Sequence, residues 1–380
     1  MNAPITWGQV ARTLAAEFAV RAPVHDRDGS FPHANFAQLH QAGLLALAAP
    51  RALGGQGASL SQLAEVVGAL ARGCPATALV LTMQFMQHRS MGRPASPWPE
   101  ALARKLVREA VLGASLMNAL RVEPELGSPA RGGLPGTVAR RTADGWRISG
   151  HKVYATGAPI LSWYLVWART DETEPRTGAF VVPAHAPGIR IDPTWDHLGL
   201  RASGSHDVLL HEVPIPLDHA LDLRLPRDWA PADGHTQADM AVLLSSLYTG
   251  IAHAARDWLV GFLRERAPAS LGAPLATLPR VQEAVGRIDG LLFTNDRVIA
   301  VLAGDVDAAV AVPTAHSGLL KATATHNAIE AVQAALQLTS NHGLSRRNPL
   351  ERHLRDVLCG RVHTPQDDSV YGAAGRHALA

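Results

Sequence analysis

Three long helical patterns follow one another in the second half of the chain, and they constrain the fold more than any other feature. Apolar residues recur every three or four positions through 240–264, 278–302 and 314–340, and 352–361 adds a shorter helical piece. Each helix therefore carries an apolar stripe that has to be buried against a neighbour. Consecutive long helices usually pack antiparallel to one another. We predict a C-terminal four-helix bundle over residues 221–380.

The residue pattern changes twice before this bundle. Residues 1–115 follow a helical pattern that includes an apolar stripe over 60–71. Residues 116–220 instead contain short apolar or alternating runs, such as 146–153, which are bounded by Gly, Pro and Asp. Closely spaced strands of this kind favour a β-barrel or sandwich over alternating strands and helices. The expected fold is α+β and multidomain, with an N-terminal helical domain, a central β domain and the bundle.

The composition is that of an ordinary globular protein. The 380 residues are 47% hydrophobic and 18% charged, which is enough to build more than one packed unit. The net charge is +2 and no basic run alternates with aromatic residues, so we expect no nucleic-acid partner. The 18 histidines are scattered, without a pair at metal-ligand spacing beside carboxylates, so we expect no metal site.

Cysteine content and hydropathy indicate the compartment. Cys74 and Cys359 are too few for a disulfide framework and suit a reducing environment. The first 18 residues lack the basic and apolar regions of a signal peptide. Gly, Pro or polar residues interrupt every apolar stretch before it reaches the ~20 residues of a membrane span. We expect a cytoplasmic protein without a membrane partner.

Six short segments, taken together, resemble conserved segments of the acyl-CoA dehydrogenase superfamily in order and spacing. Val122-Glu123-Pro124-Glu125-Leu126-Gly127-Ser128 resembles the family's "TEPGAGS". Gly150-His151-Lys152-Val153-Tyr154-Ala155-Thr156 resembles "GxKxWIT". The other four lie at residues 42–57, 74–81, 198–203 and 349–356. Each segment is weak alone, but the six in this order identify the chain as a member of the family and imply the same three-domain fold.

The resemblance implies a flavin between the β domain and the bundle: FAD, with FMN as the alternative. Thr156 would offer its hydroxyl near flavin N5, and Tyr154 would replace the Trp that packs against the isoalloxazine. Gly127 and Ser128 would bind the pyrophosphate or ribityl chain. Val122 replaces the Thr that normally contacts the ring. Without the family context, Tyr154 and Thr156 would read as ordinary strand residues.

The resemblance also implies a homodimer or homotetramer in which a neighbouring subunit completes the FAD site. Arg266, Gln337 and Gly343 fall at the corresponding positions, but the motifs around them differ from the family pattern. We therefore expect weaker FAD binding or a different flavin. The helix over 314–340 is apolar on more than one face, which agrees with oligomerisation.

The family's catalytic glutamate is missing. Ordinary members remove the α-proton of an acyl thioester with a Glu near the C-terminus, where this chain has His363 and Thr364. Other members carry the Glu on the first bundle helix, where this chain offers Asp239, a residue more typical of a helix N-terminus. Asp367 and Asp368 are either a displaced base or solvated loop residues.

The stretch around His363 resembles the C-terminal segment of flavin monooxygenases on the same scaffold. In those enzymes His and small hydroxyl groups hold or protonate the oxygenated flavin, a role that suits a side chain with a near-neutral pKa. His88 follows a helix that faces the substrate in this scaffold, so we expect either a second polar group of the site or a surface residue at a helix end.

Three functions remain open from the sequence. The first is a dehydrogenase or oxidase for a small acyl-CoA-like substrate, such as a CoA thioester, with Asp367, Asp368 or His363 as base and electron-transfer flavoprotein as partner. The second is a monooxygenase supplied by a flavin reductase. The third is a non-catalytic partner subunit of a heteromeric acyl-CoA dehydrogenase.

Overall fold

The computed structural model describes residues 5–126, 133–229 and 234–379. Five helices begin the described part: α1 (Trp7–Asp28), α2 (His33–Gln41), α3 (Leu60–Gly73), α4 (Pro75–Met91) and α5 (Glu100–Leu112). The Ser59 hydroxyl accepts from the backbone N–H of Gln62, and the Gln62 side chain accepts from the backbone N–H of Ser59. This capping box satisfies otherwise unpaired N–H groups and fixes the start of α3. Pro75 opens α4, where a missing N–H costs nothing.

The β domain consists, within the described ranges, of one eight-stranded sheet. Its strands are β1 (Leu116–Leu120), β2 (Val138–Arg141), β3 (Trp146–Ala155), β4 (Leu161–Thr170), β5 (Thr177–Pro183), β6 (Ile189–Asp192), β7 (His206–Ile215) and β8 (Ala220–Arg224). The order is β6-β7-β3-β2-β4-β5-β8, with β1 paired to β4. β1 and β2 run parallel to β4, and the remaining pairs are antiparallel.

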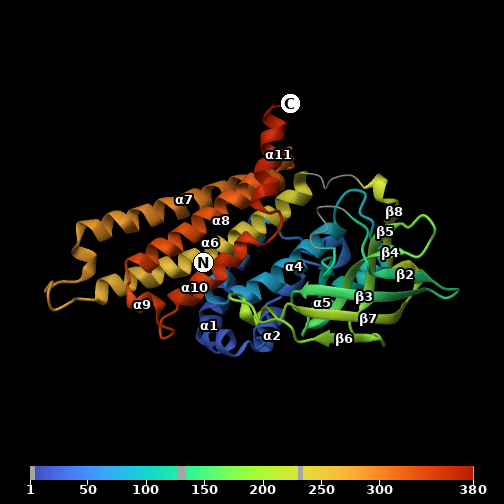
Figure 1. Ribbon diagram of the computed structural model, residues 1–380, viewed down its shortest axis with the longest axis horizontal. Helices are drawn as coiled ribbons and strands as arrows, with labels where there is room; N and C mark the ends of the chain where they lie inside the picture. The colour runs from blue at the N-terminus through green and yellow to red at the C-terminus, as the bar shows by residue number, and fades with distance from the viewer. Residues whose placement is uncertain (1–4, 127–132, 230–233, 380) are drawn as a thin grey trace.

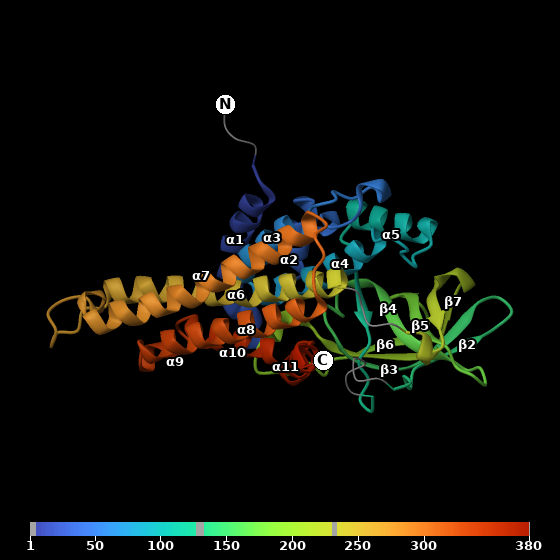
Figure 2. The same cartoon turned by 90° about the horizontal axis from the view of Figure 1, so that it is seen from above.

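The third domain begins with three long helices that run side by side, as Figures 1 and 2 both show. They are α6 (Gly234–Glu265), α7 (Pro279–Asp307) and α8 (Thr314–Gln337), and α9 (Asn341–Leu344), α10 (Leu350–Leu358) and α11 (Asp367–Leu379) follow. α10 packs across α6 and α8, and α11 packs on α8. The predicted succession of helical domain, β domain and helical bundle is confirmed.

The N-terminal helices attach to the bundle through a close contact of α3 with α6. A Cβ at Gly250 on α6 would lie 2.3 Å from the carbonyl oxygen of Gly68 on α3, so only glycine fits this crossing. One apolar core runs continuously through all three domains, and a smaller cluster lies between α5 and the sheet. No helix in the described part of the chain is long and apolar enough to cross a membrane.

Candidate active site

Tyr154 lies at the end of β3 with its ring turned outward. Its backbone φ is 59°, a left-handed conformation that costs energy for a non-glycine residue and is often found at functional sites. The side chain is 55% exposed. The ring makes edge contacts with Trp195 and His197, at 6.4 and 5.9 Å between centroids, and those two stack on each other. One aromatic face of Tyr154 can therefore accept a flat ligand.

Thr156 is buried two residues further on and begins a chain of hydroxyl groups. Its Oγ1 lies 3.0 Å from Ser205 Oγ, which lies 2.8 Å from Ser203 Oγ. Asn118 on β1 donates from Nδ2 to the Thr156 carbonyl at 3.0 Å and fixes the backbone there. A hydroxyl both donates and accepts, so this chain can turn Thr156 toward either kind of ligand atom. Sequence reasoning missed both serines and Asn118.

Glu123, directly after Val122, forms a buried ion pair with Lys152. Glu123 accepts from the backbone N–H of Gly136 and Thr137 and from Lys152 Nζ, the last at 2.6 Å. Both side chains of the pair are almost fully buried. Burial lowers the pKa of Lys152 to about 8, and Glu123 opposes that shift. Glu123 therefore clamps Gly136 and Thr137 to the segment that follows Val122.

The two loop residues expected to bind the flavin, Gly127 and Ser128, lie outside the described residues. Val122 itself is half-buried, and its carbonyl accepts from the backbone N–H of Val153 at 3.0 Å. This bond places Val122 beside β3 and one residue from Tyr154. Val122, Tyr154 and Thr156 therefore come together as the sequence predicts, although their contact with a flavin stays a prediction.

His363 is half-buried in the turn before α11 and is hydrogen-bonded to a residue that sequence reasoning missed. Tyr248, fully buried on α6, shares a hydrogen bond between its hydroxyl and His363 Nδ1. Burial, together with the charge of Lys321, lowers the pKa of His363 to about 4. Burial also raises the pKa of Tyr248 well above that of a free phenol. Both partners are therefore neutral at physiological pH.

The other C-terminal candidates lie around His363. Thr364 is exposed, and Asp368 is exposed and accepts from the backbone N–H of Ser369 at 2.8 Å. Asp367 is half-buried in the first turn of α11, and its Oδ1 has no hydrogen-bond partner among the described residues. The charge of Asp367 raises the pKa of the buried Lys321 against the lowering effect of burial. Asp367 thus interacts with the buried cation beside His363.

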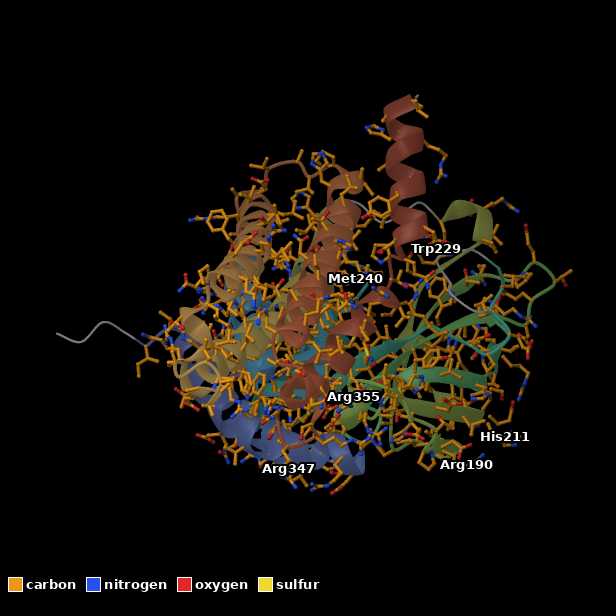
Figure 3. All side chains as sticks on the ribbon, turned by 60° about the vertical axis from the view of Figure 1, so that its left-hand side comes forward. Arg190, His211, Trp229, Met240, Arg347 and Arg355 are labelled. Carbon is orange, nitrogen blue, oxygen red and sulfur yellow. The ribbon has the colours of Figure 1, made fainter. Side chains whose placement is uncertain are left out.

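The loop that ends in Ser203 also contacts α10, which precedes His363. A Cβ at Gly199 would lie 2.2 Å from the Arg355 carbonyl oxygen, so the two backbones touch. Arg355 binds Asp26 with two hydrogen bonds of 2.9 and 2.6 Å. Figure 3 shows Arg355 where the bundle meets the β domain. The hydroxyl chain of Thr156 and the helix that leads to His363 are thus joined through one loop.

His88 lies inside the molecule, so the alternative of a surface position is wrong. Its side chain is fully buried on α4, and Gln84 Nε2 lies 3.3 Å from His88 Nε2. Within the ranges that the structure describes, His88 Nδ1 has no hydrogen-bond partner. Burial lowers the pKa of His88 to about 4, so the ring is neutral. A catalytic role for His88 stays a prediction.

Asp239, at the second family position for a base, is held by two arginines. Its carboxylate lies 2.8 Å from Arg89 Nη2 and 2.6 Å from Arg93 Nη2. Arg93 also donates to the Thr236 hydroxyl. Both carboxylate oxygens of Asp239 therefore face an arginine.

The residues expected to complete an FAD site lie far from Tyr154 within one chain. Arg266 follows α6, Gln337 ends α8 and Gly343 lies in α9, at the end of the bundle remote from the β domain in both Figure 1 and Figure 2. Arg266 and Gln337 are exposed, and a Cβ at Gly343 would collide with Thr339 Oγ1. They can reach a flavin at Tyr154 only from a second subunit, which stays a prediction.

Comparison with known proteins agrees with this architecture. The family models for the N-terminal, middle and C-terminal domains of acyl-CoA dehydrogenase match residues 7–92, 121–213 and 242–367. The acyl-CoA dehydrogenase homologue YdbM of Bacillus subtilis is 32% identical over 96% of this chain and 94% of its own length. The amino sugar nitrososynthase DnmZ of Streptomyces peucetius is 32% identical over 90% of this chain and 84% of its own length.

Solved structures give the same result. KijD3, in complex with FMN and dTDP-3-amino-2,3,6-trideoxy-4-keto-3-methyl-D-glucose, superimposes with a TM-score of 0.85 and 28% identity, covering 99% of this chain and 95% of KijD3. Butyryl-CoA dehydrogenase from Megasphaera elsdenii shares the fold, with a TM-score of 0.87 at 20% identity and full coverage of both chains. The chain is a member of the acyl-CoA dehydrogenase family.

Proposed function

We propose that this protein is a reduced-flavin-dependent monooxygenase that uses FMN. The observation that carries the proposal is the neutral Tyr248–His363 pair at the place of the family's C-terminal glutamate. Of the alternative carboxylates, Asp239 lies between two arginines, and the charge of Asp367 acts on Lys321. A site in which each candidate carboxylate already interacts with a cation is poorly suited to removing the α-proton of a thioester.

The residues around Tyr154 suit a flavin ring. The exposed phenol ring supplies an apolar face, and Thr156 supplies a hydroxyl that Ser205 can reorient. A reduced flavin bound there would supply the two electrons that activate dioxygen. With Tyr248 bound to Nδ1, His363 has Nε2 left to donate or accept one hydrogen bond. Burial excludes much of the surrounding water and strengthens that hydrogen bond.

Relatives support both the flavin and the substrate class that we propose. KijD3 was solved with FMN and a dTDP-linked amino sugar, and DnmZ is named for amino sugars. The altered sequence around Arg266 and Gln337 gives a second reason to favour FMN over FAD, because those residues fall at the positions where a neighbouring subunit would complete an FAD site. We propose a small amine-bearing substrate, of the amino sugar class, and a separate flavin reductase as the partner.

A dehydrogenase is the second candidate. The likeness to YdbM over nearly the whole chain favours it. Asp367 supplies a half-buried carboxylate with one oxygen that binds no described residue. In that case Asp367 would accept the substrate proton, and electron-transfer flavoprotein would accept the electrons.

One pair of experiments separates the two candidates. Butyryl-CoA added without oxygen to the FMN-loaded protein should leave the flavin absorbance unchanged. Reduced FMN, ¹⁸O₂ and the dTDP-amino sugar found in KijD3 should give ¹⁸O-labelled product by mass spectrometry, and His363→Ala should lose that label. Bleaching by butyryl-CoA that Asp367→Asn abolishes would replace the proposal with the dehydrogenase. A chain that binds neither FMN nor FAD would instead be a non-catalytic subunit.

A further inference from the structure

One face of α8 carries three buried polar residues one turn apart: Ser317, Lys321 and Thr325, here called the α8 polar cluster. Their side chains are at most 2% exposed. Ser317 Oγ, Lys321 Nζ and Thr325 Oγ1 have no hydrogen-bond partner among residues 5–126, 133–229 and 234–379. Buried polar groups in folded proteins nearly always have a partner, which is often ordered water. A buried ammonium without one is especially costly.

The segment that carries His363 lies over this cluster. A Cβ at Gly360 would lie 2.6 Å from Thr325 Cγ2 and 3.2 Å from the Tyr248 ring. A Cβ at Gly318 would lie 3.2 Å from the side chain of Val370 on α11. Residues 360–370 therefore cross the face of α8 on which Lys321 lies, between Gly318 and Thr325 in the sequence. Figures 1 and 2 both show α11 beside the first turns of α8.

Charge interactions link the same groups. Lys321 lowers the pKa of His363, and Asp367 raises the pKa of Lys321. Among the described residues, the charges of Cys359 and Asp356 also affect Tyr248. Lys321 is thus the cation whose charge acts on His363, and Asp367 is the carboxylate whose charge acts on Lys321.

We propose that Lys321 is a positioning residue for His363: its ammonium, bridged by ordered water to the hydroxyls of the α8 polar cluster and to Asp367, sets the charge and tautomer of the imidazole. A second positive charge on His363 is unfavourable beside a buried ammonium. In the proposed state the un-ionised Tyr248 hydroxyl donates to Nδ1, and the single ring proton is on Nε2. The effect of Lys321 on the oxygenation rate rests on the monooxygenase proposal. Its effect on His363 does not, because the contacts between these residues exist without flavin.

The test is a ¹⁵N NMR measurement of the histidine rings in the flavin-free, full-length protein, with His363 assigned by the loss of its signal in His363→Gln. In the wild type we expect a neutral ring protonated on Nε2. Lys321→Met should raise the pKa of His363 by about 1 unit or more, because the like charge is gone. Lys321→Arg keeps the charge and serves as the matched control. A folded Lys321→Met protein whose His363 titration matches the wild type would overturn the proposal.

A second variant guards against misfolding. Lys321→Met leaves Asp367 without its cation, so Lys321→Met/Asp367→Asn removes both charges together and should fold if the single variant does not. The same rise in the His363 pKa is expected, and its absence in this folded variant also counts against the proposal. In the pH profile of oxygenation, the acidic limb should shift by the same amount. An NMR shift without any oxygenation would contradict the proposed function and leave the positioning role intact.

Discussion

The backbone N–H of Leu200 donates to the carboxylate of Asp356 at 2.6 Å, and this bond joins the β domain to α10. Leu200 has a left-handed backbone, with φ of 51°, which the bond helps to hold. Burial raises the pKa of Asp356 to about 6, with the charge of Asp26 adding to the effect. The carboxylate that holds the backbone at Leu200 is therefore easier to protonate than an ordinary aspartate.

Asp356→Asn should increase stability at alkaline pH. The pKa of Asp356 is higher in the folded protein than in the unfolded chain. Its contribution to the free energy of unfolding is therefore fully present below the unfolded pKa and is lost as pH rises through about 6. Asparagine keeps an acceptor for Leu200 without the buried charge, so we expect a gain of about 1 kcal/mol or more above neutral pH. Urea denaturation across the pH range measures it. Asp28→Asn, at a 52% exposed side chain, is the control, and a loss of stability in Asp356→Asn at high pH would contradict this account.

Tyr248→Phe tests the hydrogen bond to His363. Removing the hydroxyl leaves Nδ1 without its partner, at a net cost of about 1 kcal/mol. We expect roughly a fivefold fall in the oxygenation rate with little change in the Kd for FMN, because Tyr248 acts through His363. Stopped-flow oxygenation measures the rate. Tyr371→Phe, at an exposed position on α11, should behave as the wild type, and equal effects of the two variants would exclude a specific role for Tyr248.

The three-domain order was predictable because periodicity and turn residues are local signals. The helical pattern over 240–264 appears as α6, and the apolar stripe over 60–71 appears as α3. The motif from Gly150 to Thr156 likewise lies on and just after β3. Each of these features is encoded within a few neighbouring residues, so one sequence is enough to find it.

Long-range polar contacts could not be predicted in the same way. Tyr248 and His363 are 115 positions apart, and Tyr248 lies in a buried stretch of α6 made of apolar residues, serines and a threonine. Lys321 interrupts a similar stretch of α8 and reads as a solvated residue, although it is fully buried. His88 near a helix end suggested the surface, but α4 is buried on most sides. Only the packing of helices decides which polar side chains are enclosed.

Tyr154→Ala should weaken FMN binding. The exposed ring is held outward by a left-handed backbone against Trp195 and His197, and its loss removes the apolar face proposed for the flavin. Stacking of a flat ring on an aromatic side chain contributes about 1–3 kcal/mol, so Kd should rise roughly tenfold or more. Isothermal titration with FMN measures it. Tyr154→Phe keeps the ring and should bind normally; equal affinity of Tyr154→Ala and the wild type would place the flavin elsewhere.

Lys152→Met should destabilise the β domain strongly. It leaves Glu123 buried with its two backbone donors and no cation, and breaking a buried pair from one side typically costs about 3–5 kcal/mol. Lys152→Met/Glu123→Gln removes both charges and should recover part of the loss. Denaturation midpoints measure both. Arg287→Met, which breaks the exposed pair with Glu283, should change stability by less than about 1 kcal/mol. A similar small effect for Lys152→Met would show that the clamp is unimportant for folding.

Acid should destabilise the protein through its buried histidines. Burial lowers the pKa of His88 to about 4 and that of His353 to about 3, against about 6.5 in an unfolded chain. Because these pKa values are lower in the folded protein, the neutral histidines contribute their full stability above the unfolded pKa. That contribution is lost as pH falls toward the folded pKa. The lowered pKa of His363 adds to the effect of His88 and His353, whereas Asp356 works in the opposite direction and is a single group. Stability should therefore fall by a few kcal/mol between about pH 7 and pH 4.

His88→Gln should reduce that acid sensitivity, because glutamine cannot take up a proton at this buried position. The comparison is the slope of unfolding free energy against pH, measured by urea denaturation, rather than absolute stability, which the change in side-chain shape also affects. His326→Gln, at a 71% exposed side chain on α8, is the matched control and should leave the slope unchanged. If His88→Gln retains the full wild-type slope, the acid lability arises elsewhere, and His88 is not the neutral, enclosed ring described above.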